Sequence, residues 1–131
     1  MNDKVSSEIL RWAADYLAEN GHVKGTAYDY PKIQEGLRAR GYMNVDNPPN
    51  EIVREIIVDG VPSCAMGAIG AAAARLGLGT YSSACDDATD HLQTWLTANT
   101  EQHWTAVPAW NDYPSTSMED VILAMKRAAE E

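Results

Sequence analysis

Cys64 is the side chain with the clearest chemical potential, because it directly precedes a run of small helix-forming residues. Unpaired amides at the start of a helix lower the pKa of a thiol and favour the nucleophilic thiolate. A cysteine-dependent hydrolase or transferase also needs a general base and a group that orients it. The weak candidates for those roles are His22, His91 or His103 as the base and Asn111 or Asp112 as the orienting group.

No local signature of a cysteine protease accompanies Cys64, so we assign no catalytic set. The interpretation we favour is that a small thiol fills space beneath an Ala/Gly-rich helix, since free cysteine is among the most buried residue types. His22 follows the end of a predicted helix, and we expect it to be an exposed residue.

The tripeptide Trp110-Asn111-Asp112 is a second candidate site. An indole wall with two short polar groups is typical of a small-molecule pocket. Alternatively, the indole anchors a loop to the core while Asn111 or Asp112 bonds to nearby backbone in a turn. We favour the anchor and keep the three residues as candidate ligand-binding residues.

Metal and phosphate sites are weakly supported by the sequence. Asp87 and His91 are four residues apart, a spacing that places two metal ligands on one helical face. No third ligand is evident, so we expect solvated side chains and no metal. The glycines of Gly67-Ala68-Ile69-Gly70 lack the Lys-Ser/Thr that follows a phosphate-binding loop. We therefore expect no cofactor.

The elements that position these residues are predicted to be mostly helical. Apolar residues recur at spacings of three and four in residues 6–20, 31–40 and 82–98, and again after Ser117. Ser6 or Ser7 is the expected cap of the first helix, whose buried face includes Trp12. Ser117 and Asp120 form a variant of the capping box.

Residues 64–76 form a predicted helix of very small side chains, which we expect to be the buried central helix. Residues 51–61 fit a short helix or a strand and tight turn equally well, and we favour a short helix that runs into a small extended or hairpin piece. Residues 104–114 are expected to be a loop. The sequence therefore predicts a mainly α protein, one compact domain over residues 1–131 with about five helices and at most a small β ribbon.

Several of these segments resemble a family of small uncharacterised proteins from actinobacteria and their phages. The matching pieces are Arg11–Leu17 with Gly21 and Gly25, Cys64–Ile69, Trp110–Asp112, and Glu119–Ile122 with Ala128-Ala129. The resemblance implies an origin in an actinobacterium or a phage, and it implies no particular activity.

Charge narrows the range of partners. The chain has 19 acidic and 10 basic side chains, for a net charge of −9. Residues 1–79 carry ten acids and eight bases, whereas residues 80–131 carry nine acids and only Lys126 and Arg127. This distribution argues against nucleic-acid binding through phosphate contacts and against an anionic membrane surface. A basic partner protein, from the host if a phage encodes the chain, is compatible with it.

Three features of the sequence predict a cytoplasmic protein. The start of the chain shows no secretory signal, and the uncharged stretch from Val61 to Ala74 is too short to span a membrane. Cys64 and Cys85 have no CxxC spacing, so we expect reduced thiols in the cytoplasm.

The leading hypothesis is a non-catalytic protein–protein interaction module. The alternatives are a cysteine enzyme using Cys64 and a small-molecule binding module around Trp110, and the oligomeric state is open.

Overall fold

The computed structural model describes residues 3–42, 48–79, 82–100 and 106–131. Seven helices form in these ranges, and no strand does, which confirms the predicted mainly α class. They are α1 (Asp3–Asn20), α2 (Tyr30–Ala39), α3 (Asn50–Asp59), α4 (Ala65–Arg75), α5 (Ser83–Asn99), α6 (Val107–Asp112) and α7 (Met118–Ala129). Among the described residues, none of the helices has the length and apolar character needed to cross a membrane.

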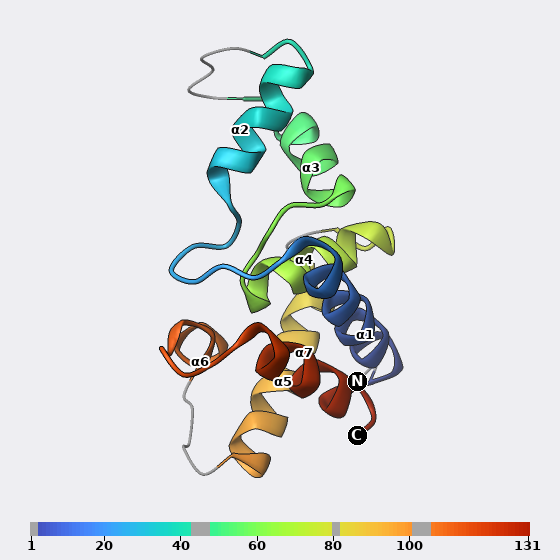
Figure 1. Cartoon of the computed structure of the whole chain (residues 1–131). Coiled ribbons are helices and arrows are strands. Elements are labelled where there is room, and N and C mark those ends of the chain that lie inside the picture. Colours follow the sequence, from blue (N-terminus) through green and yellow to red (C-terminus); the bar gives the residue numbers. More distant parts are fainter. Residues whose placement is uncertain (1–2, 43–47, 80–81, 101–105) are drawn as a thin grey trace.

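The body of the molecule consists of α1, α4, α5, α6 and α7 (Figure 1). Helix α1 packs against α4, α5 and α7. Helix α4 is buried along most of its length, as predicted for the Ala/Gly-rich segment. Its small side chains pack against α1, α3, α5 and α6.

Helices α2 and α3 form an arm that extends from this body, at the top of Figure 1. The two helices pack on each other through buried Ile33, Leu37 and Ile56, and α3 also contacts α4. The ambiguous residues 51–61 are therefore largely helical. The residues after Gly60 are extended, but they form no hairpin with α3.

Two connectors, residues 21–29 and residues 61–64, join the arm to the body, and they pair with each other. The Val23 N–H donates to the Ser63 carbonyl at 2.9 Å, and the Asp29 N–H donates to the Pro62 carbonyl at 2.9 Å. Ser63 thus forms isolated bridges to His22 and to Tyr28. These bridges take the place of the small β ribbon that the sequence allowed.

Three local predictions were wrong. Ser6 and Ser7 lie inside α1, because the helix begins at Asp3. Trp12 is 39% exposed, since it lies at the edge of the buried stripe formed by Ile9, Ala13 and Tyr16 rather than within it. Residues 107–112, expected to be loop, form α6, with a proline in its first turn where no N–H is needed.

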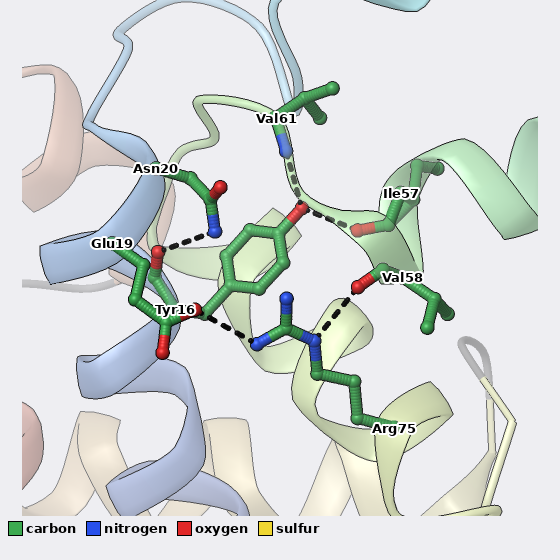
Figure 2. A network of polar contacts seen from close by, with 7 residues as sticks. All are labelled: Tyr16, Glu19, Asn20, Ile57, Val58, Val61 and Arg75. Atoms are coloured by element: carbon green, nitrogen blue, oxygen red, sulfur yellow. Dashed lines mark hydrogen bonds and ion pairs between the residues drawn. The ribbon is translucent and has the colours of Figure 1, made fainter. Parts of the chain in front are cut away.

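The C-terminus of α3 is capped by side chains from two other helices (Figure 2). The Tyr16 hydroxyl donates to the Ile57 carbonyl at 2.7 Å and accepts from the Val61 N–H at 3.0 Å. A continuing helix would join that carbonyl and that N–H directly. The fully buried Tyr16 hydroxyl from α1 is therefore inserted where the chain leaves the helix.

Arg75, at the end of α4, satisfies the next carbonyl of α3. Its Nε donates to the Val58 oxygen at 2.9 Å, its guanidinium lies 4.7 Å from the centre of the Tyr16 ring, and it forms an ion pair with Glu19. Gly60 is required beside this cap, because its φ is 127° and an added Cβ would collide with the Asn20 side chain. The arm is thus attached by polar contacts from α1 and α4.

Tyr16→Phe should destabilise the protein by about 1–3 kcal/mol, because it leaves the buried Val61 N–H and the Ile57 carbonyl without their shared partner. Urea denaturation followed by circular dichroism measures the change. Tyr30→Phe is the control, since Tyr30 is 53% exposed and its loss of a hydroxyl should leave stability within 0.5 kcal/mol, roughly the limit for surface changes. Equal effects of the two variants would contradict the capping role of Tyr16.

Candidate functional site

Cys64 is the N-cap residue of α4, at the helix start that the sequence predicted. Its Sγ accepts a hydrogen bond from the Gly67 N–H at 3.3 Å. The residue is 8% exposed, and burial raises the pKa of the Cys64 thiol despite the N–H groups of Gly67 and Met66, which lower it. The nearby Asp112 carboxylate raises the pKa further. The environment therefore favours the neutral thiol over the thiolate.

The position of Cys64 is fixed by the connectors and by one glycine. The Cys64 N–H donates to the Ala27 carbonyl at 2.9 Å, which draws the 21–29 connector across the first turn of α4. A Cβ on Gly67 would lie 2.3 Å from that carbonyl oxygen. A glycine is therefore needed at position 67 for this close approach of two backbones.

Asn111, on α6, is the most connected side chain in the cluster and is fully buried. Its Oδ1 accepts from the Ala65 N–H at 2.8 Å and lies 2.7 Å from the Nε2 of His22. Its Nδ2 donates to the Val23 carbonyl at 3.3 Å and to Asp112 Oδ1 at 2.9 Å. These four contacts use the full hydrogen-bonding capacity of the amide. They also satisfy one of the orphan N–H groups at the start of α4.

Asp112 extends the same network towards solvent. Its Oδ1 accepts from the Gly25 N–H at 2.9 Å as well as from Asn111. The Gly25 N–H is the main reason that the pKa of Asp112 lies below its usual value, and the Asn111 amide, Lys24 and His22 contribute in the same direction. Lys24 also donates to the Tyr113 carbonyl at 2.6 Å. The end of α6 is thus attached to the 21–29 connector by its own side chains and by the Lys24 side chain of the connector.

The structure brings four of the predicted site residues into one cluster, which we call the Asn111 cluster: Cys64, His22, Asn111 and Asp112. His22 is half-buried and bonded, so the prediction of an exposed residue was wrong. The tertiary contact with α6, 89 residues away in the chain, holds its ring. Among the described residues, the Cys64 sulfur accepts one hydrogen bond, from Gly67, and has none with His22.

The remaining candidates lie elsewhere. Trp110 is 6% exposed and belongs to the hydrophobic core, as an anchoring indole would. His91 is on α5, and its Nε2 lies 2.7 Å from the Ala128 carbonyl, while Asp87 on the same helix is exposed. No group of three metal-ligating side chains gathers in the part of the chain that the structure describes. His103 falls within residues 101–105, outside the described ranges.

Sequence reasoning did not identify the backbone partners of this cluster. Gly25, Ala65 and Val23 act through their N–H and carbonyl groups, so their side-chain identities carry little signal of these contacts. The one available signal was Gly25 itself, since glycine is a typical turn residue.

The chain belongs to the family of unknown function DUF6197, whose model matches residues 1–131. The chain matches no curated protein and no solved structure. Membership in the family confirms the resemblance to uncharacterised proteins, and it assigns no activity.

Asn111→Ala should destabilise the protein by about 3 kcal/mol, because it leaves the Ala65 N–H and the Val23 carbonyl unpaired and opens a small cavity. Thermal and urea denaturation measure the loss. Asn99→Ala is the matched control, since exposed Asn99 bonds only to the Trp95 carbonyl of its own helix in the described structure. A loss below 1 kcal/mol for Asn111→Ala, on the order of an ordinary surface bond, would show that the network is not structural.

Proposed function

We propose that this protein is a non-catalytic interaction module that binds a basic partner protein through the acidic surface of α5. The observation that carries the proposal is the exposure of three aspartates on α5, Asp86, Asp87 and Asp90, that lack ion-pair partners in the described part of the chain. All three are exposed on α5, and no ion pair among the described residues involves them.

The contrast with the first half of the chain supports this proposal. The ion pairs of the described part all use acids from residues 1–79: Glu19 with Arg75, Glu35 with Lys32, and Asp59 with Arg40. The segment from Leu76 to Met125 contains no lysine or arginine that could neutralise the α5 acids from within. A negative surface of this kind attracts a basic partner and speeds its encounter.

The Asn111 cluster contains the residue types of a cysteine enzyme, but its geometry does not favour catalysis by Cys64. Catalysis needs a thiolate and a base that takes its proton. The His22 ring bonds to Asn111, as a base would bond to its orienting group, but burial favours the Cys64 thiol and no hydrogen bond joins the ring to the sulfur among the described residues. These features support a structural role for the cluster. The proposed binding module acts in the cytoplasm, that of the host cell if a phage encodes it.

Alkylation of the folded protein by iodoacetamide should modify Cys64 much more slowly than a free thiol at pH 7.5, roughly 100-fold, because the sulfur is buried and mostly protonated. The measurement is made in a Cys85→Ser background, so that Cys64 is the remaining thiol. The same protein in urea provides the unfolded reference rate. Alkylation as fast as in urea, with a pH midpoint below 7.5, would overturn the non-catalytic proposal and favour the enzyme.

Binding of an octapeptide of alternating arginine and glycine, measured by calorimetry, should weaken about three- to tenfold in the double variant Asp87→Asn/Asp90→Asn. The double variant Glu51→Gln/Glu55→Gln is the matched control, because it removes two exposed acids from α3 in the arm. It should bind nearly as the wild type does. A peptide with citrulline in place of arginine should not bind, since it keeps the shape but lacks the charge.

The wild-type affinity should also fall as salt is raised, because exposed charges are screened. Absence of any arginine-peptide binding at low salt, or equal losses in the α5 and α3 variants, would contradict the proposed function.

A further inference from the structure

A cleft lies beside the acidic surface, between the 21–29 connector, α4 and α5. It encloses about 180 Å³. The residues that line it are Ala27, Tyr28, Met66, Gly67, Gly70, Cys85, Asp86 and Thr89. It adjoins the Asn111 cluster, since its lining residues Gly67 and Ala27 are hydrogen-bonded to Cys64, but it contains none of the four residues of that cluster.

The walls of the cleft are mostly apolar. Met66 is 36% exposed at its edge, and the Tyr28 hydroxyl is directed to the Gly67 carbonyl at 3.0 Å, which leaves the ring as a lining surface. Gly67 and Gly70 are three residues apart on α4, so both present backbone without a side chain on one face.

Apart from the Tyr28 hydroxyl and the Cys85 thiol, the polar side chains among the described lining residues are those of Thr89 and Asp86. The Thr89 hydroxyl donates to the Cys85 carbonyl at 2.9 Å within α5. Asp86 is exposed, lies in the first turn of α5, and takes part in no ion pair among the described residues. The cleft therefore combines mostly apolar walls with one exposed carboxylate that has no ion-pair partner among the described residues.

We propose that this cleft receives one lysine or arginine side chain of the basic partner. Such a side chain has an apolar stem and a charged end, which match the Met66 and Tyr28 walls and the Asp86 carboxylate. A neutral apolar side chain would cover Asp86 without replacing its hydration, and an anionic one would be repelled. This inference rests on the proposed function and names the point of contact.

The test compares Asp86→Asn with Asp87→Asn, using the arginine–glycine octapeptide as the probe. Both variants remove one charge from adjacent positions of α5, but only Asp86 lines the cleft. We expect Asp86→Asn to raise the Kd about tenfold and Asp87→Asn to raise it no more than about threefold. Thermal unfolding of both variants checks that the helix start is equally preserved.

A second measurement uses the unmodified protein, so it does not depend on how the variants fold. In ¹⁵N-labelled wild-type protein, the amide signals of Gly67 and Gly70 should shift and saturate as the octapeptide is added. Equal effects of the two variants, or unmoved Gly67 and Gly70 signals, would overturn the cleft proposal while arginine-peptide binding to α5 still stood. Failure of the wild type to bind the octapeptide would overturn the proposed function as well.

Discussion

The structure depends on satisfying the backbone polar groups of two connectors that belong to no helix. Residues 21–29 and 61–64 pass between the arm and the body, and Ser63 within them is fully buried. A buried N–H or carbonyl without a partner costs about 1–3 kcal/mol. The connectors pair with each other at only a few points, so side chains from the helices must supply the rest.

Two polar centres meet that need, and each joins distant parts of the chain. Tyr16 with Arg75 closes the end of α3, and Asn111 with Asp112 closes the start of α4 and holds the 21–25 turn. The first centre attaches the arm to α1 and α4, and the second attaches α6 to α4 and to the 21–29 connector. Both use a side chain in place of a missing backbone partner, which explains why these polar groups lie among helices that are otherwise packed through apolar residues.

Local patterns carried most of the fold. The apolar spacing of α1, α2, α5 and α7, the run of small side chains in α4 and the capping box at Ser117 each predicted a helix that the structure contains. Helix α6 was missed because its Pro108 and its Asn111-Asp112 end are typical of turns. A helix of six residues is not stable by propensity alone. It forms because Val107, Trp110 and Asn111 are buried by the body, and that information is not local.

In the candidate site, too, the sequence identified the residues but not the tertiary contacts that they make. The sequence identified Cys64, His22, Asn111 and Asp112 as residues capable of chemistry, and these residues do meet. Their roles were not predictable, because the partners of Asn111 include groups 46 and 89 residues away in the chain. An asparagine that accepts from two donors and donates to two acceptors has no hydrogen-bonding capacity left for a bound ligand.

The division of charge gives the α5 surface its significance. In residues 1–79, near-equal numbers of acids and bases allow Arg40, Arg75 and Lys32 to pair within the protein. On α5, self-repulsion among Asp86, Asp87 and Asp90 is relieved in part by the positive end of the helix dipole. That effect decays within the first turn, so Asp90 gains little from it. Since no lysine or arginine lies between Leu76 and Met125, the remaining compensation would come from a cationic side chain of the basic partner that we propose.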